Sequence, residues 1–247
     1  MTLVTAAHER GITTLTLDSP DNRNALSARL VGELAEALTA CGKDPSVRAV
    51  VLTHTGTTFS AGADLKAPPS PYTFVELLRR IVELPKPVVA RVTGQVRAGG
   101  LGLAGACDIV AAGTAADFAL TEVRIGVAPA VISLPLLPRL DPRAAARYYL
   151  TGERFDAAEA ARIGLVSVVA RDGEDVDAAL APVLDGLRRA SPQGLAESKR
   201  LVTARVLETF ERDAEDLVQR SASLFASAEA REGMTAFLER RDPAWVV

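Results

Sequence analysis

The stretch RAGGLGLAGACDIV, residues 97–110, decides the fold because its glycines can serve two different purposes. Residues 100–105 have the G-x-G-x-x-G spacing of a dinucleotide-binding loop. That fold requires a full crossover helix between the glycines and the next strand. Here the strand-like residues 108–113 follow almost at once, so a helix over residues 98–106 is too short for the crossover. A dinucleotide site is therefore disfavoured.

The second purpose of this segment is to present a backbone N–H to a ligand. Gly99 and Gly100 stand at the expected start of the helix, where the N–H groups have no partner within the helix and negative charge is favoured. A glycine also permits close approach of a ligand to the backbone. One such N–H is half of an oxyanion hole. The structural alternative is that Gly102 and Gly105 only allow tight packing in the core.

A second donor is expected in TFSAGADLK, residues 58–66, which follows the strand-like RAVVLTHTG. Ligands of α/β proteins bind at the carboxyl ends of strands, so the N–H of Ala63 is the candidate, with Asp64 capping the next turn. Glu122 ends the β-like run DFALTE among apolar neighbours, where an acid is costly unless it is used or paired. It is the candidate proton-transfer group. The alternative is a surface acid paired with Arg124.

The composition of the chain argues against several classes of function. The chain has 247 residues, a net charge of -3 and no long basic run, which argues against nucleic acid as a partner. Its apolar stretches are short and broken by prolines, so no membrane-spanning segment is expected. Two cysteines and two histidines outside any ligand cluster predict buried thiols, a reducing compartment and no metal site. No signal peptide is evident either, so we expect a cytoplasmic protein.

Two regions differ along the chain. Residues 1–172 alternate β-like runs with amphipathic helices, expected over 27–43 and 73–84, and predict an α/β core. Residues 173–247 carry only helical patterns. This helical arm either serves assembly or packs on its own core, and the sequence does not choose between the two.

The segments quoted above resemble, in order and spacing, the enoyl-CoA hydratase/isomerase (crotonase) superfamily, and the resemblance covers almost the whole chain. SPDNRNALS (residues 19–27), LTGERFDAAEAARIGLVSVV and AREGMTAFLERRDPAW add to it. The resemblance implies an α/β crotonase-like ββα spiral core and a helical C-terminal trimerisation region, assembled as a homotrimer or homohexamer. It implies an acyl-CoA thioester substrate, with coenzyme A as part of the substrate and no separate cofactor.

Residue roles also follow from the resemblance. Ala63 and Gly99 match the two oxyanion-hole donors, and Glu122 matches the second of the two glutamates of the standard hydratase. We expect hydration of an α,β-unsaturated enoyl-CoA thioester with Glu122 as the single glutamate, because Gly102 stands where the first glutamate is expected. The alternatives are an enoyl-CoA double-bond isomerase and a CoA-binding protein with weakened or lost catalysis. The motifs are similar to methylglutaconyl- and carboxygeranoyl-CoA hydratases. The residues expected to bind substrate or CoA are Arg23, Asn24, Ala25, Ala61, Ala63, Asp64, Leu65, Lys66, Arg97, Gly99, Phe237 and Arg240.

Arg97 departs from the family pattern, which has an apolar or small residue just before the glycines. A cation near a helix N-terminus is disfavoured by the helix dipole, so its position requires a reason. We expect either that Arg97 binds an anion, such as a CoA phosphate or an acyl carboxylate, or that it pairs with an acid on the surface.

Overall fold

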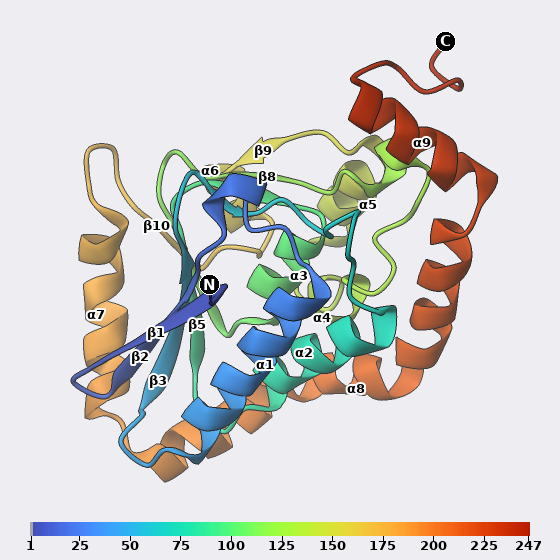
Figure 1. The fold of residues 1–247 in the computed structure, drawn as a ribbon. Coiled ribbons are helices and arrows are strands. Elements are labelled where there is room, and N and C mark those ends of the chain that lie inside the picture. Colours follow the sequence, from blue (N-terminus) through green and yellow to red (C-terminus); the bar gives the residue numbers. More distant parts are fainter. Residues whose placement is uncertain (1) are drawn as a thin grey trace.

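The structure is a computed structural model that describes residues 2–247. The larger of its two β-sheets holds six strands and lies between layers of helices (Figure 1). β1 and β2 form an antiparallel hairpin, and every other neighbouring pair is parallel. In sheet order the strands are β1 (Val4–Glu9), β2 (Ile12–Leu17), β3 (Ala49–His54), β5 (Val88–Val92), β7 (Ile109–Ala112) and β10 (Val168–Val169).

A second, smaller sheet is formed by β4 (Thr58–Ser60), β6 (Gln95–Arg97), β8 (Asp117–Ala119) and β9 (Phe155–Asp156). The first three strands are parallel, and β9 is antiparallel to β8. Three times in succession, a strand of the large sheet is followed by a short strand of the small sheet, as in β3–β4, β5–β6 and β7–β8. A helix follows each of these pairs, so the expected ββα spiral is confirmed.

Alternate residues of the large sheet face two different helical layers. Leu15, Val50 and Leu52 point to the main core, which the helices α1 (Ala28–Lys43), α2 (Pro71–Glu83) and α3 (Gly99–Ala106) share. Residues such as Val51 and Val89 point to the other face, where α7 (Val176–Arg189) covers them. Figure 1 shows α7 on the side of the sheet opposite α1. The helices expected over 27–43 and 73–84 are confirmed with shifts of one or two residues at their ends.

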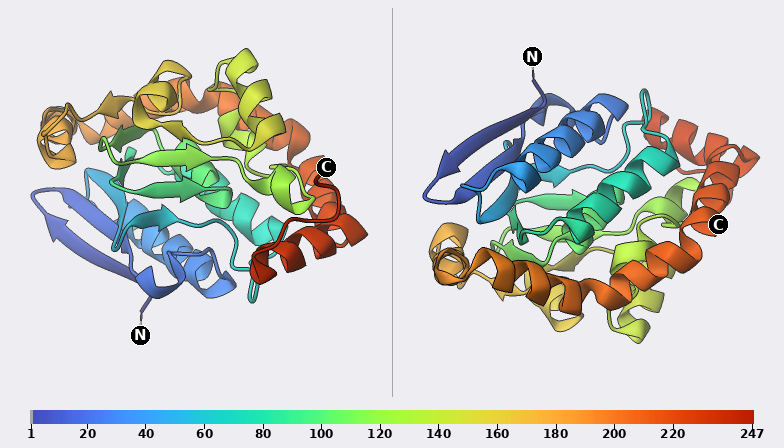
Figure 2. Two further views of the ribbon diagram at one scale, coloured as in Figure 1. Left: turned by 90° about the horizontal axis from the view of Figure 1, so that it is seen from above. Right: turned by 90° about the horizontal axis from the view of Figure 1, so that it is seen from below.

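The C-terminal region packs on its own core. The long helix α8 (Pro192–Phe225) runs along α2 and contributes Val206, Phe210 and Val218 to the main core (Figure 2). Its Lys199 is buried and forms an ion pair of 2.8 Å with Asp108, which anchors α8 beneath the sheet. The last helix, α9 (Ala228–Glu239), packs against the turn η2 (Glu122–Ile125). Residues 173–247 are therefore part of the folded unit, whatever they contribute to assembly.

The remaining helical elements are short. They are η1 (Pro20–Asn22), α4 (Ser133–Leu136), α5 (Pro142–Thr151) and α6 (Ala157–Arg162).

Within residues 2–247 no helix combines the length and the apolar character needed to cross a membrane. Both cysteines are buried free thiols, as expected.

Candidate active site

Three neighbouring strands of the small sheet end at the three segments that the sequence singled out. In β4, β6 and β8, Ser60 lies beside Val96 and Arg97 lies beside Ala119. The carboxyl ends of parallel strands meet at one edge of a sheet. The loop 61–64, the first residue of α3 and Glu122 therefore emerge side by side. This arrangement follows from the topology and was not visible in the sequence, where the three segments are far apart.

The loop after β4 is held by the segment after η1. Leu26 forms an isolated parallel bridge with Ala63, in which Leu26 N donates to Gly62 O (2.7 Å) and Asp64 N donates to Leu26 O (3.0 Å). In this geometry Leu26 bonds the two neighbours of Ala63, so the N–H of Ala63 points away from Leu26. No acceptor within residues 2–247 takes that N–H. Asp64 accepts from Lys66 N (2.9 Å), which closes the following turn.

The first turn of α3 is brought against this loop by unusual backbone conformations. Ala98, the N-cap, has φ 47° and ψ -119°, and its N–H donates to Ala119 O (3.1 Å). Gly62 has φ 91°, and a β-carbon built on it would lie 2.8 Å from Ala98 Cβ and 3.6 Å from Gly99 N. Only glycine fits there. A non-glycine residue held at positive φ marks a constraint of the kind that clusters at functional sites.

Gly99 itself lacks room for a side chain. A β-carbon on Gly99 would lie 2.9 Å from Leu26 Cδ1 and 3.5 Å from Phe74 Cζ. As the first residue of α3 it has an N–H without an acceptor inside the helix. Gly62 and Gly99 together therefore allow the two expected donor segments to approach each other closely.

Glu122 is the buried acid of the site. Its residue is 8% exposed, and its Oε2 has no hydrogen-bond partner among the described residues. Burial raises the pKa of the carboxyl to about 7, and a hydrogen bond from its own backbone opposes the shift only in part. The alternative of a surface acid paired with Arg124 is wrong, because Glu122 is buried while Arg124 is exposed. A carboxyl with a pKa of about 7 can give or take a proton at neutral pH.

Ile132 fills the space beside Gly102. A β-carbon on Gly102 would lie 2.5 Å from Ile132 Cγ2 and 3.0 Å from Ile132 Cβ. Both residues are buried. A carboxylate side chain at position 102 is therefore incompatible with the packing of α3 against the start of α4. Sequence reasoning identified Gly102 but missed Ile132, because nothing local relates residues thirty positions apart.

In the segment expected to line the CoA, residues 23–25, Asn24 is buried and has a structural role, whereas Arg23 is accessible. Asn24 is fully buried, and its amide donates to Thr55 O (3.0 Å) and Thr58 O (2.7 Å) while its Oδ1 accepts from Ser19 N (2.8 Å). The side chain of Asn24 therefore holds the segment to β4. Arg23 is exposed, and its carbonyl accepts from Ala61 N (3.0 Å), which brings Arg23, Ala25 and Ala61 together along one edge.

Arg97 has an acid partner within the chain. Its guanidinium forms an ion pair with Asp117 on the neighbouring strand β8 and donates to Val96 O (3.0 Å) and Asp117 O (2.9 Å). Its side chain is 12% exposed. Of the two roles expected for Arg97, this geometry matches pairing with an acid, although the pair lies mostly inside the protein rather than on the surface. The pair joins the strands that lead to Gly99 and Glu122.

The other expected binding residues lie further out. Leu65 is half-buried, whereas Lys66, Phe237 and Arg240 are exposed. Phe237 lies on α9, and Arg240 ends that helix in a left-handed conformation (φ 55°). Tyr149 was not predicted; it lies on α5 and interacts electrostatically with Glu122, while its hydroxyl lies 3.2 Å from Ser133 Oγ. Burial raises the pKa of Tyr149, so its hydroxyl stays protonated.

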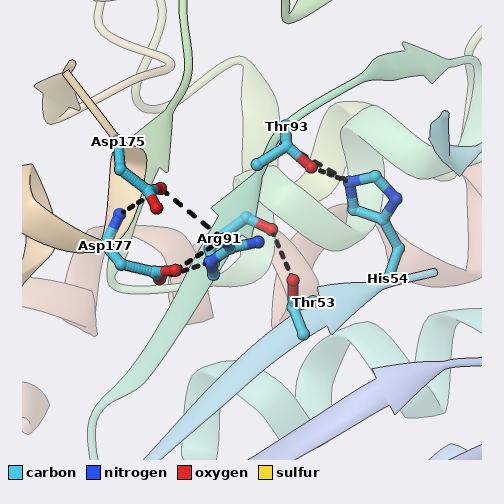
Figure 3. A network of polar contacts seen from close by, with 6 residues as sticks. All are labelled: Thr53, His54, Arg91, Thr93, Asp175 and Asp177. Carbon is cyan, nitrogen blue, oxygen red and sulfur yellow. Dashed lines mark hydrogen bonds and ion pairs between the residues drawn. The ribbon is translucent and has the colours of Figure 1, made fainter. Parts of the chain in front are cut away.

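A separate polar network lies on the α7 side of the sheet (Figure 3). Arg91 on β5 forms a two-point contact with Asp177 of α7 (2.5 and 2.7 Å), which fastens that helix to the sheet. His54 Nε2 accepts from Thr93 N (3.2 Å), and burial lowers the pKa of the imidazole. His54 is therefore neutral and structural. These residues belong to a different face from Glu122.

Comparison with known proteins identifies the family. The sequence profile of the enoyl-CoA hydratase/isomerase family matches residues 7–246. The chain belongs to that family. A solved enoyl-CoA hydratase from Mycobacterium avium is 54% identical over the whole of both chains, with a TM-score of 0.93. A Bacillus subtilis (strain 168) protein named "Probable enoyl-CoA hydratase" is 33% identical over 98% of both chains. Carnitinyl-CoA dehydratase from Salmonella paratyphi A is 34% identical over 94% of this chain and 93% of its own.

Family membership confirms the resemblance and the crotonase fold. Homology identifies the protein as an acyl-CoA enzyme of the enoyl-CoA hydratase type. The finer likeness to carboxylated enoyl-CoA hydratases is not specifically supported, because these relatives carry the names of enoyl-CoA hydratase and carnitinyl-CoA dehydratase.

Proposed function

We propose that the enzyme adds water across the α,β double bond of an enoyl-CoA thioester, with Glu122 as its single proton-transfer group. The observation that carries the proposal is the carboxyl of Glu122, which is buried without a cation at the edge where β4, β6 and β8 end. Burying an acid in this way destabilises the fold, so its retention points to a chemical use.

Ala63 and Gly99 are the proposed oxyanion-hole donors. Attack of water on the β-carbon moves electrons toward the thioester carbonyl, and the resulting enolate carries negative charge on that oxygen. Two backbone N–H groups fixed before the reaction stabilise this charge, and losing one such donor typically costs ~10²–10³ in kcat. The close approach of Gly62 to Gly99 N supports this pairing of donors.

One carboxyl group can carry out both proton transfers of the reaction. Glu122 takes a proton from the attacking water as the C–O bond forms, and a proton then passes from the carboxyl to the α-carbon. The group ends in its starting state, and the net change is the addition of one water molecule. A pKa of about 7 suits both halves of this cycle at neutral pH.

Binding of the CoA moiety is proposed for residues beside the donors, of which Arg23 and Lys66 are exposed and Ala25 and Ala61 are half-buried. Arg23, Ala25, Ala61 and Lys66 lie along the edge formed by the two bridged segments. Phe237 and Arg240 are proposed to reach the CoA of a neighbouring subunit in a trimer or hexamer. For Arg97, the ion pair with Asp117 favours a role in holding the site over direct contact with an anion.

A double-bond isomerase is the second candidate, and the Gly102–Ile132 packing is the observation that favours it. With one carboxyl group and the apolar side chain of Ile132 beside Gly102, a proton can be moved between two carbons without water. The third possibility is a CoA-binding protein whose catalysis has been lost.

Turnover of two substrates separates these three functions. The enzyme is incubated with crotonyl-CoA, a conjugated 2-enoyl thioester, and with a 3-enoyl-CoA, and the products are identified by mass. We expect crotonyl-CoA to gain one water. Conversion of the 3-enoyl to the 2-enoyl thioester without hydration would identify an isomerase. Binding of both thioesters with no product would identify a protein without catalysis.

A further inference from the structure

Glu122 depends on its neighbours for its position. It is the first residue of η2, a single turn capped by Gly126, and the turn is closed by two bonds to Glu122 O, one from Gly126 N and one from Val127 N (3.1 Å). Among the described residues the Oε2 atom has no partner, so the carboxyl group is held only by a hydrogen bond from its own backbone. An element this short cannot hold a side chain in place by itself, so the elements packed against η2 must do so.

α9 packs against η2 with its backbone directly on the backbone of the turn. A β-carbon on Gly233 of α9 would lie 2.5 Å from Ile125 C and O. In the other direction, a β-carbon on Gly126 would lie 2.7 Å from Glu229 C and O. Each element thus has a glycine opposite the backbone of the other. This contact is closer than any side chain allows, so α9 determines how far η2 can move.

Both ends of α9 are stabilised by hydrogen bonds within residues 227–244. Ser227 caps the first turn by accepting from Ala230 N (3.1 Å). Beyond the last turn, Arg241 binds both oxygens of Glu232 (2.7 and 3.0 Å), and Ala244 N donates to Glu232 Oε1 (3.0 Å). The helix is attached to the protein through its buried face, which includes Ala230 and Ala236 and packs against η2 and α8. α9 is therefore a regular, capped helix that can act as a support for η2.

We propose that α9 is the element that positions Glu122 for proton transfer, and that Gly126 and Gly233 are the positioning residues through which it acts. The inference rests on the proposed function, and it assigns α9 a role within the reaction in addition to any role in assembly. Neither glycine contacts the substrate. The titratable group that interacts with Glu122 is Tyr149 on α5, whereas Arg124 of η2 is exposed beside Gly152 and Glu229 of α9 is exposed and meets the turn through its backbone.

The test compares Gly233→Ala and Gly126→Ala with a matched control, Gly164→Ala. Gly164 has φ 93°, and its β-carbon would lie 2.6 Å from Arg139 O, so it reproduces the crowding and the strain of Gly126 in another part of the molecule. We expect kcat with crotonyl-CoA to fall about tenfold or more in the two test variants, with little change in KM, because small misplacements of a reacting group cost rate. Gly164→Ala should keep its kcat.

The ionisation of Glu122 gives a readout that needs no turnover. The infrared signal of its carboxyl is isolated by subtracting the spectrum of Glu122→Gln and is followed from pH 4 to pH 9. Displacement of η2 admits water, so the midpoint should fall from about 7 toward 4.5 in the two test variants and stay near 7 in Gly164→Ala. An unchanged midpoint in both test variants, or an equal shift in the control, would overturn the role of α9. Absence of turnover in the unsubstituted enzyme would instead contradict the proposed function, and the infrared titration would still decide the role of α9.

Discussion

Glu122 illustrates how a single residue can be unfavourable for the fold and useful for the reaction. Its pKa is raised from 4.5 to about 7 by burial, so the folded protein binds a proton between these values that the unfolded chain does not. By linkage, the free energy of unfolding then decreases as the pH rises from about 4.5 to about 7, and it stays lower above that range.

Glu122→Gln should therefore stabilise the protein at alkaline pH. Glutamine has nearly the same shape but cannot ionise, so the variant avoids the cost of a buried charge. We expect its free energy of unfolding to exceed that of the unsubstituted enzyme by roughly 3 kcal/mol at pH 8, and the difference to vanish near pH 4. Urea unfolding at both pH values measures it. A variant that is less stable at pH 8 would show that Glu122 is not buried as a free acid.

Roles of single residues that depend on their neighbours in the sequence were predictable, and contacts between residues far apart in the sequence were not. An acid within an apolar run already indicated that Glu122 is used or paired. The partner of Arg97 was not predictable, since nothing in the sequence indicates that the strands of Arg97 and Asp117 are neighbours in the sheet. Likewise, no local pattern indicates that Asn24 is fully buried.

At the scale of elements, the contact between α3 and the start of α4 explains the missing first glutamate. Gly102 has no side chain because Ile132 fills the adjoining space. The packing therefore leaves no room for a carboxylate side chain at position 102, which agrees with the proposed mechanism in which Glu122 is the single carboxyl group.

A double-mutant cycle on Gly102→Ala and Ile132→Ala tests this contact. Gly102→Ala should destabilise by about 1–3 kcal/mol through overpacking, and Ile132→Ala by roughly 2–5 kcal/mol through loss of a buried side chain. Because the second change removes the atoms that the first would meet, the combined variant should be more stable than additivity predicts by at least ~1 kcal/mol. Urea unfolding of the four proteins provides the values. Effects that add within ~0.5 kcal/mol would contradict the packing.

The long elements of this fold were predictable, and the short ones were not. Continuous apolar runs and amphipathic stripes identify β3, α1 and α2, which are long enough to display a period. β4, β6 and β9 have two or three residues each, too few for any pattern. β4 and β6, together with β8, bring the three site segments to one edge, so the geometry of the site depends on a sheet that sequence patterns reveal only in part.

At the scale of the whole molecule, a set of large apolar side chains remains exposed on the single chain. α8 and α9 supply four of them, as the adjacent pairs Leu201–Val202 and Phe237–Leu238. The apolar residues concerned are Leu137 (49% exposed), Leu150 (76%), Leu201 (80%), Val202 (71%), Phe237 (58%) and Leu238 (65%).

These surfaces are consistent with the trimer or hexamer expected from the family resemblance. Light scattering at micromolar concentration should give a mass of three or six times 26.0 kDa. Covering the apolar side chains in an assembly supplies the driving force. A strictly monomeric mass would show that α8 and α9 serve only the fold of their own chain.

The kcat of Glu122→Gln with crotonyl-CoA tests most directly whether Glu122 carries the proton transfer beside two backbone donors. We expect a loss of at least ~10²-fold, as for removal of a general acid–base group. Binding of acyl-CoA, measured by calorimetry on the same variant, should be unchanged, because the amide preserves shape and the proposed CoA contacts lie elsewhere. Near-normal turnover by Glu122→Gln would show instead that another group moves the proton.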